Sequence, residues 1–431
     1  MVPVIDPEAR VSALIVLREW GRIGCIGFGG PPTHIALLRE LCVRRKRWLE
    51  PTEFEDAVAA CNLLPGPAST QLSIFCAWRV RGRLGALIGG LAFIVPGLIL
   101  ILALAALFLA GTPPQWVSAA GAGAGAAVPV VAVHAALGLL PASWRRAADR
   151  NGHRDRTGNS DRDRTGNNDS ADDSDGDGDG DGDESRSTTR SRRLRWIGYL
   201  IAGGVASALV GPWLVLVLLG CGAIELASRT KPGDRRQSLI SPAVLLGQGT
   251  AAVAGLLAVA WVAIKVGALS YGGGFVIIPL MQADAVDHYH WMTGGQFLSA
   301  VALGQITPGP VVHTVAVVGY AAAGLPGAIL AAAVAFSPSF GFILLGASQF
   351  DRLRANLRVR AFLDGAGPAA IGAILGSAVP LGRALTGPWQ YALLAAAAIL
   401  LFALRRGVVL TLLACAALAV LLSAAGVLVT G

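Results

Sequence analysis

Long apolar runs without charge dominate this chain, and short clusters of charged residues separate them. A helix needs about 20 predominantly apolar residues to cross a bilayer, and ten runs approach or exceed that length. The pattern predicts an all-α polytopic membrane protein with about ten spans. We expect them at roughly 11–30, 84–110, 117–141, 196–210, 213–228, 250–272, 322–348, 361–381, 388–404 and 407–429.

The two halves of the chain resemble each other. Ile23–Leu38 (IGCIGFGGPPTHIALL) aligns with Val266–Met281 (VGALSYGGGFVIIPLM) at an offset of 243 residues. The same offset aligns Pro65-Gly66-Pro67 with Pro308-Gly309-Pro310. An internal match of this length indicates a duplicated unit.

Charge predicts that the two units have opposite orientations. The loop at Arg39–Trp48 (RELCVRRKRW) carries five Arg or Lys residues, whereas the equivalent Gln282–Trp291 (QADAVDHYHW) carries two Asp and neither Lys nor Arg. Loops rich in Lys and Arg stay in the cytoplasm. We therefore expect two inverted-topology repeats, in which each Pro-Gly-Pro segment forms a re-entrant broken helix that returns to its own side.

Four segments follow from this organisation. Residues 1–141 form the first-repeat core, 196–241 hold the remaining helices of that repeat, and 242–431 form the second, inverted repeat. We expect 142–195 to be a disordered, low-complexity cytoplasmic loop, because its RDRTGN repeats and Asp-Gly run hold almost no apolar side chains.

Composition excludes several classes of function. The net charge is +8, but Lys and Arg cluster at the ends of apolar runs, so we expect topogenic charge and no nucleic-acid partner. Six cysteines form no CxxC pair, and neither a disulfide framework nor a zinc site is expected. HExxH and the phosphate-binding GxxxxGK[ST] motif are absent. We expect no cofactor, no metal and no cleaved signal peptide, and a membrane enzyme is the less favoured alternative.

Four helix breaks predict a binding site. Gly29-Gly30-Pro31-Pro32, Gly272-Gly273-Gly274 and the two Pro-Gly-Pro segments interrupt apolar stretches. Helix N-termini at such breaks offer free N–H groups to an anion, although small polar residues at a kink can also serve only for capping and packing. The predicted substrate-binding residues at the breaks are Gly29, Gly30, Thr33, Pro65, Gly66, Ser69, Thr70, Gln71, Gly272, Gly273, Thr307, Gly309, His313 and Thr314.

Three further residues could serve an anion carrier. Arg22 and Lys265 align at the same offset, each just before a glycine break. Cations inside membrane segments are costly and usually functional, so we add both to the predicted binding residues, with snorkelling to the interface as the alternative. His34, which aligns with Ile277, is a proton-linked candidate with packing as the alternative.

The motifs also resemble a known family. Phe28–Leu38 (FGGPPTHIALL), Leu63–Leu72 (LLPGPASTQL), Tyr271–Met281 (YGGGFVIIPLM) and Ile306–Tyr320 (ITPGPVVHTVAVVGY) are similar to the long, bidomain members of the chromate ion transporter family. The similarity covers roughly 11–141 and 250–380, with weaker likeness in the C-terminal spans.

The resemblance implies a secondary transporter, multi-pass in the cytoplasmic membrane, that exports chromate and confers chromate resistance. Chromate is a tetrahedral dianion and suits the site read from the residues. A carrier for sulfate or another oxyanion is the alternative, because the same pocket would serve it. The expected partners are a small inorganic oxyanion and the lipid bilayer, and a homodimer is left open.

Overall fold

The computed structural model describes residues 11–61, 64, 66–111, 113–148, 180–209, 214–229, 251–270, 275, 277–346 and 356–426. These residues form helices joined by short connections, with no strand among them, which agrees with the predicted all-α class. The first half holds α1 (Ala13–Ile26), α2 (Pro31–Arg39), η1 (Glu40–Arg45), α3 (Pro51–Cys61), α4 (Ala68–Phe108), α5 (Gln115–Ala148), α6 (Gly180–Leu209) and α7 (Leu214–Arg229). The second half holds α8 (Ala251–Leu269), α9 (Ile277–Gln282), η3 (Ala283–His288), α10 (Gly294–Ile306), η4 (Val311–His313), α11 (Thr314–Gly346), α13 (Leu357–Arg383), α14 (Pro388–Ala398), η6 (Ile399–Ala403) and α15 (Val408–Ala424).

Each of the ten predicted spans coincides with a helix. Four stretches are long and apolar enough to cross a membrane: Ala68–Phe108, Gln115–Arg145, Val311–Gly346 and Leu357–Arg383. Three shorter apolar helices accompany them at Gly255–Leu269, Pro388–Ala403 and Val408–Ala424. The chain therefore has the helices of a membrane protein, and the number ten stays a prediction.

Local backbone conformations recur at the offset found in the sequence. The π-helical turns η1 and η3 lie 243 residues apart, and each is followed by a non-glycine residue with positive φ, Arg47 (51°) and His290 (53°). Each extra residue in a π-turn widens the helix locally and redirects the chain. The two halves thus share backbone detail, while their opposite orientation in a membrane stays a prediction.

Helices α4 and α11 each fold back on themselves. Non-helical φ/ψ values occur at Arg81-Gly82 and at Ala323-Gly324, the equivalent positions at offset 242. A methyl group added at Gly85 would lie 2.2 Å from the Ala77 carbonyl oxygen, whereas eight residues of straight helix span about 12 Å. The limb that follows each Pro-Gly-Pro segment therefore pairs with the limb after the kink, while the re-entrant path in a membrane stays a prediction.

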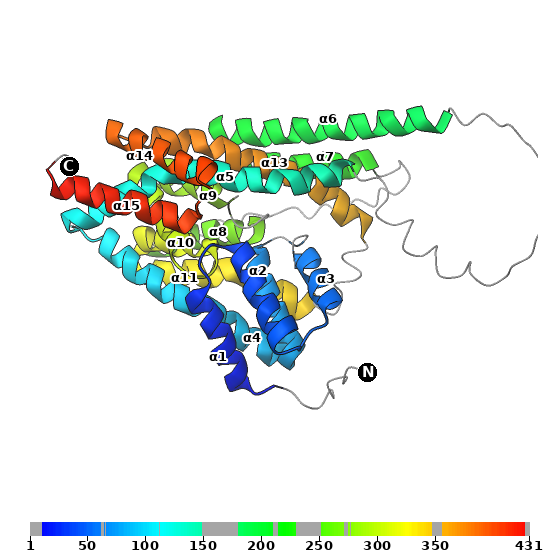
Figure 1. The fold of residues 1–431 in the computed structure, drawn as a ribbon, viewed down its shortest axis with the longest axis horizontal. Coiled ribbons are helices and arrows are strands. Elements are labelled where there is room, and N and C mark those ends of the chain that lie inside the picture. Colours follow the sequence, from blue (N-terminus) through cyan, green and yellow to red (C-terminus); the bar gives the residue numbers. More distant parts are fainter. Residues whose placement is uncertain are drawn as a thin grey trace, which may run out of the picture.

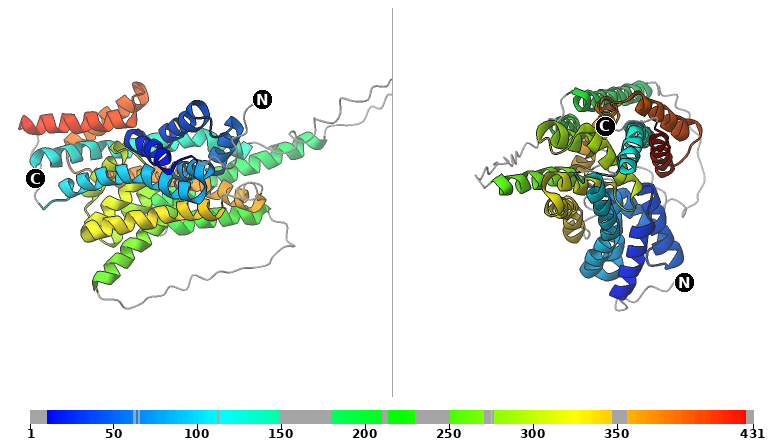
Figure 2. Two further views of the ribbon diagram at one scale, coloured as in Figure 1. Left: turned by 90° about the horizontal axis from the view of Figure 1, so that it is seen from below. Right: turned by 90° about the vertical axis from the view of Figure 1, so that its left-hand side faces the viewer.

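The two halves interlock. α5 of the first half packs against α14 and α15 of the second, and α13 of the second packs against α6 and α7 of the first. Figure 1 shows α6, α7 and α13 side by side. The right-hand view of Figure 2 shows α1–α4 on the opposite side of the molecule from α6. α1 packs on α4, α4 on α11 and α11 on α8, so these four helices form one packed group next to the breaks.

The segment 142–195, which the sequence predicts to be a disordered loop, is helical at both of its ends. α5 continues to Ala148 and α6 begins at Gly180, so helices enter the segment from both sides. Extending an existing helix costs far less than nucleating one, which allows helices anchored in apolar runs to continue into polar sequence. Residues 149–179 lie outside the described residues.

Helices α6 and α13 pack closely because glycine residues of each helix lie against backbone carbonyl groups of the other. A methyl group added at Gly203 would lie 1.9 Å from the Ala369 carbonyl oxygen, and one at Gly372 would lie 1.9 Å from the Leu200 carbonyl oxygen. Small residues allow membrane helices to approach this closely and to gain dispersion energy.

We predict that Gly203→Ala lowers the melting temperature of the purified protein by several degrees, because overpacking costs about 1–3 kcal/mol. Gly198→Ala is the matched control on the same helix, since nothing lies within 4 Å of a methyl group there. Thermal unfolding followed by circular dichroism measures both variants. Equal melting temperatures for the two would contradict the close joint.

Candidate functional site

The first glycine break ends one helix and starts the next. α1 ends at Ile26 and α2 begins at Pro31. Gly29 (φ 98°) and Gly30 (φ 75°) lie in the left-handed region, which glycine adopts without steric cost. In the second half α8 ends at Leu269 and α9 begins at Ile277. A break therefore occurs in both halves where the sequence predicts one, and Gly272 and Gly273 themselves lie outside the described residues.

The Pro-Gly-Pro segments separate α3 from α4 and α10 from η4. Gly66 (φ 114°) and Gly309 (φ 93°) both adopt left-handed backbone. The helix after the first segment begins at Ala68, with Ser69, Thr70 and Gln71 in its first turn, as predicted. Pro65 lies outside the described residues.

Each Pro-Gly-Pro break packs against the first helix of the other half. The Gly309 N–H donates to the Gly27 carbonyl oxygen at 3.0 Å. The first Pro-Gly-Pro break lies against the second half in a similar way. A methyl group added at Gly66 would lie 3.4 Å from the carbonyl oxygen of Gly267 in α8 and 3.4 Å from Ser339 Oγ in α11. The first glycine break, the two Pro-Gly-Pro breaks and the last turn of α8 thus lie in one region, where every residue from Ala68 to Ala77 is buried.

His34 connects the first glycine break to the start of α4. Its Nε2 lies 2.8 Å from the Gly27 carbonyl oxygen and its Nδ1 lies 3.3 Å from Ser69 Oγ. The carbonyl can only accept, so Nε2 carries a hydrogen. In the neutral imidazole Nδ1 then accepts from the Ser69 hydroxyl. The ring also packs edge-on against Phe93, with centroids 5.0 Å apart.

Several buried polar side chains near the breaks have no hydrogen-bond partner among the described residues. The set comprises Thr70 Oγ1, Ser270 Oγ, Gln305 Nε2, Ser339 Oγ and both ring nitrogens of His313. Thr70 and His313 are equivalent positions at offset 243, and both are fully buried. The Ile94 backbone faces the His313 ring only at longer range. Unpaired buried polar groups are rare in folded proteins and call for a ligand or water as an explanation.

The other predicted residues at the breaks form hydrogen bonds or close contacts with nearby backbone. Thr307 Oγ1 donates to the Leu303 carbonyl oxygen at 2.9 Å, and Thr314 Oγ1 donates to the Val311 carbonyl oxygen at 2.9 Å. A methyl group at Gly29 would lie 3.0 Å from Thr33 Oγ1, and one at Gly66 would lie 2.6 Å from the Gln71 side-chain nitrogen. Polar atoms thus crowd the glycine backbone on both sides of the site.

The two predicted intramembrane cations have different surroundings. Arg22 lies on the exposed side of α1. Lys265 donates to Asp284 Oδ2 at 2.6 Å, with side-chain exposures of 16% and 6%, and its ammonium lies 5.6 Å from the centre of the Trp261 ring. Asp284 already balances the charge of Lys265, and joint binding of a dianion by Arg22 and Lys265 stays a prediction.

Sequence reasoning missed Asp284, Ser270, Gln305 and Ser339 as members of this region. From the sequence, Asp284 is recognised only as one of the two acidic residues of its loop. The repeat offset was a usable signal for the serines, because Ser270 aligns with Gly27 (offset 243) and Ser339 with Gly97 (offset 242), both of which pack at the breaks.

We predict that Asp284→Asn lowers the melting temperature by several degrees, because it leaves a mostly buried ammonium unpaired. The double variant Lys265→Gln/Asp284→Asn should recover part of that loss, since no charge is then left alone. Arg22→Gln, at the equivalent exposed position, is the matched control and should change little. Additive losses in the double variant would show that the two side chains do not stabilise each other.

Comparison with known proteins places the chain in a family. It matches the chromate transporter family over residues 14–226 and 257–421. It is 28% identical over 371 residues to a chromate transport protein of Cupriavidus metallidurans, covering 84% of this chain and 80% of that protein. It is 29% identical over 368 residues to a chromate transport protein of Pseudomonas aeruginosa, covering 84% and 79%.

A probable chromate transport protein of Synechococcus elongatus is 28% identical over 370 residues, covering 84% of this chain and 82% of that protein. No solved structure matches. The family match spans both halves, including the helices on either side of every break. The chain therefore belongs to the chromate transporter family.

Proposed function

We propose that this protein is a secondary transporter that moves chromate, a tetrahedral dianion, out of the cytoplasm and so confers chromate resistance. The observation that carries the proposal is the pair Thr70 and His313. They occupy equivalent positions directly after the two Pro-Gly-Pro breaks, both are buried, and both have side-chain polar atoms without partners among the described residues. An oxyanion supplies acceptors for such groups.

The chemistry of the breaks suits a dehydrated oxyanion. A dianion that leaves water needs several charge-assisted hydrogen bonds to offset its desolvation. The starts of α4 and η4 offer backbone N–H groups and positive dipole ends. The hydroxyls of Ser69 and Thr70 add donors on the first helix, and the ring N–H of neutral His313 adds one on the second.

The whole predicted set at the breaks belongs to the proposed site. Gly29, Gly30, Gly66, Gly272, Gly273 and Gly309 let backbone approach the anion closely. Thr33, Gln71, Thr307 and Thr314 hold the adjoining turns. The curated relatives named as chromate transport proteins support the substrate class. Sulfate has the same shape and charge, so selectivity is an outcome of the transport test.

His34 gives the proposal a route for proton coupling. With a neutral ring, the Ser69 hydroxyl donates to Nδ1. Protonation places a hydrogen on Nδ1, so Ser69 Oγ must accept there and its own hydrogen becomes free to face the anion. Proton binding at His34 and oxyanion binding at Ser69 would then favour each other, so proton and anion would move in the same direction, and the inside-negative membrane potential would drive the dianion outward. The sequence lacks an ATP-binding P-loop, which fits coupling to an ion gradient.

The inverted orientation of the halves belongs to this proposal too. In the first half Glu19 of α1 pairs with Arg45 of η1 and lies 3.8 Å from Lys46. In the second half Lys265 of α8 pairs with Asp284 of η3. The first helix of each half thus forms an ion pair with its π-turn, but the π-turn residue is basic in the first half and acidic in the second. A basic turn on the inside and an acidic turn on the outside fit inverted halves in a cytoplasmic membrane.

We predict that a cysteine at position 287 reacts with a membrane-impermeant maleimide in intact cells, whereas a cysteine at position 44 reacts only after permeabilisation. Both Asp287 and Arg44 are exposed, so access is not limited by burial. Cys25, the exposed native cysteine, is first changed to Ala. Labelling of both positions from the same side would exclude inversion.

We predict that Thr70→Val leaves the melting temperature unchanged or higher but reduces energised chromate uptake into everted vesicles about tenfold to a hundredfold. Valine keeps the shape and removes a hydroxyl that has no protein partner, while a hydrogen bond to a charged ligand contributes about 1.5–3 kcal/mol. The control is Thr411→Val, a fully buried threonine in α15 that bonds only its own helix.

Uptake is measured with and without excess sulfate, and with a protonophore. Normal chromate transport by Thr70→Val would remove Thr70 from the site. Sulfate flux without chromate flux would assign the carrier to sulfate. Inserted protein that carries neither anion would overturn the proposed function.

A further inference from the structure

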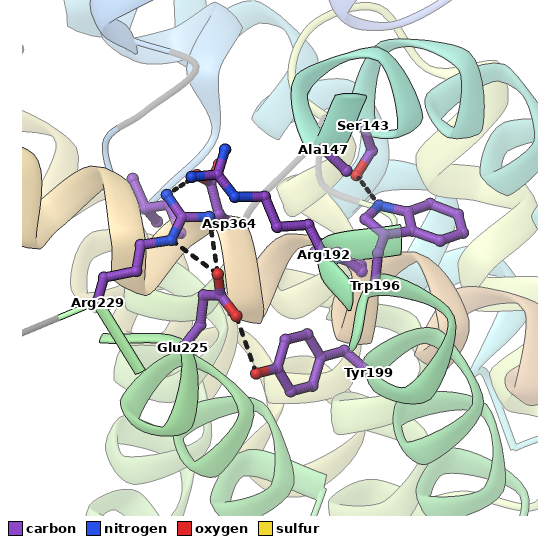
Figure 3. A pocket seen from close by; sticks show the side chains of 10 residues that line it. Ser143, Ala147, Arg192, Trp196, Tyr199, Glu225, Arg229 and Asp364 are labelled. Atoms are coloured by element: carbon purple, nitrogen blue, oxygen red, sulfur yellow. Dashed lines mark hydrogen bonds and ion pairs between the residues drawn. The ribbon is translucent and has the colours of Figure 1, made fainter. Parts of the chain in front are cut away.

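A charged pocket lies away from the helix breaks, between α5, α6, α7 and α13 (Figure 3). Its floor is Glu225, which is 3% exposed. Glu225 accepts from Tyr199 Oη at 3.1 Å and forms ion pairs with Arg195 at 3.1 Å and Arg229 at 2.7 Å. The carboxylate is therefore fully compensated and is not the group that would attract a ligand.

Arg229 connects the two halves of the chain here. It also pairs with Asp364 of α13 at 2.9 Å, and among the described residues this is the ion pair that joins the first half to the second. Its guanidinium is held from two sides by carboxylates. Such a side chain is preorganised, so presenting its remaining N–H groups to a further oxyanion costs little entropy.

Arg192 is the second arginine that can bind a ligand in this pocket. It lines the pocket and forms no ion pair among the described residues. Among the described residues around the pocket, three arginines, 192, 195 and 229, outnumber the two carboxylates, 225 and 364. In Figure 3 the side chains of Arg192 and Arg229 reach toward the same place from opposite walls.

The pocket admits a compact ligand. Its cavity volume is about 20 Å³, which holds one or two water molecules, so one or two phosphate oxygens can enter while the rest of a headgroup stays outside. Trp196 Nε1 donates to Ser143 Oγ at 2.9 Å, so the serine hydroxyl hydrogen is able to turn toward the pocket. A tetrahedral oxyanion would therefore meet two guanidinium groups and a hydroxyl.

The surroundings are those of a membrane interface. Trp144 and Trp196 pack edge-to-face with centroids 4.9 Å apart, and Arg193 lies 5.3 Å from the Trp144 ring centre. Tryptophan and basic residues gather at the level of lipid headgroups. The outer face of α6 carries apolar side chains at spacings of three and four, with exposed fractions of 61%, 39% and 56% for Leu194, Ile197 and Ile201. Acyl chains can pack along that face.

We propose that this pocket binds the phosphate group of an anionic phospholipid, held by Arg192 and Arg229, with its acyl chains along the outer face of α6. Basic pockets between membrane helices bind anionic headgroups in this way. The lipid phosphate would lie next to the ion pair of Arg229 and Asp364, which joins the two halves, and would stabilise the contact between them. The site is separate from the proposed substrate site and does not depend on chromate transport.

The test uses the purified full chain in detergent, with phosphatidylglycerol added in one arm and phosphatidylcholine in another. Native mass spectrometry counts retained lipid. We expect selective retention of phosphatidylglycerol, reduced about tenfold in Arg192→Gln because the guanidinium makes charge-assisted hydrogen bonds. Arg193→Gln, its neighbour outside the pocket, is the matched control and should retain lipid like the wild type. Arg192→Lys keeps the positive charge but loses the planar guanidinium, which can donate two parallel hydrogen bonds to a phosphate. This variant should therefore retain an intermediate amount of lipid.

A second measurement separates lipid binding from misfolding. Phosphatidylglycerol should raise the melting temperature of the wild type and of Arg193→Gln by more than that of Arg192→Gln. Equal retention by all variants would overturn the proposal. Inorganic phosphate that displaces the lipid and raises the melting temperature as strongly would assign the pocket to a soluble oxyanion, and the lipid proposal would fall.

Discussion

The hydrogen bond from the Gly309 N–H to the Gly27 carbonyl oxygen joins a broken helix of the second half to a broken helix of the first. A helix that breaks inside a membrane leaves backbone groups that lipid cannot satisfy. The break must therefore be buried in protein or supplied with a partner. Here each half covers the break of the other, which explains why the residues from Ala68 to Ala77 and from Val311 to Gly319 are all buried. The position of the candidate site follows from this constraint.

The duplication made the breaks predictable, because glycine and proline interrupt helices by known steric effects. The fold-back of α4 at Arg81-Gly82 was also within reach of the sequence, since the span was expected to begin at residue 84. The pairing of α13 with α6 was not. It depends on Gly203 and Gly372 lying opposite carbonyl groups of another helix, and no periodicity along one helix identifies its partner. For the same reason, the sequence predicts that Lys265 binds an anionic substrate but does not reveal its ion pair with Asp284 of η3, 19 residues later in the chain.

One group of helices lies next to the breaks, and a second group interlocks the two halves. In the first group α1 packs on α4, α4 on α11 and α11 on α8. In the second group α13 packs on α6 and α7, and α5 packs on α14 and α15. Glycine-to-carbonyl contacts occur in both groups. A methyl group at Gly123 would lie 2.6 Å from the Cys415 carbonyl oxygen, and one at Gly267 would lie 2.1 Å from the Ala335 carbonyl oxygen. Joints this close tolerate little sliding within either group.

The unpaired polar groups at the breaks bear on whether the site is only a packed kink. A kink needs small residues and satisfied backbone, and Thr307 and Thr314 fit that role because each bonds a nearby carbonyl oxygen. Thr70 and His313 do not fit it. Valine at position 70 would fill the same space without a hydroxyl, and an apolar residue at position 313 would avoid burying two ring nitrogens. Each unsatisfied buried group costs about 1–3 kcal/mol. That such groups recur at equivalent positions of both halves is better explained by a shared ligand than by packing.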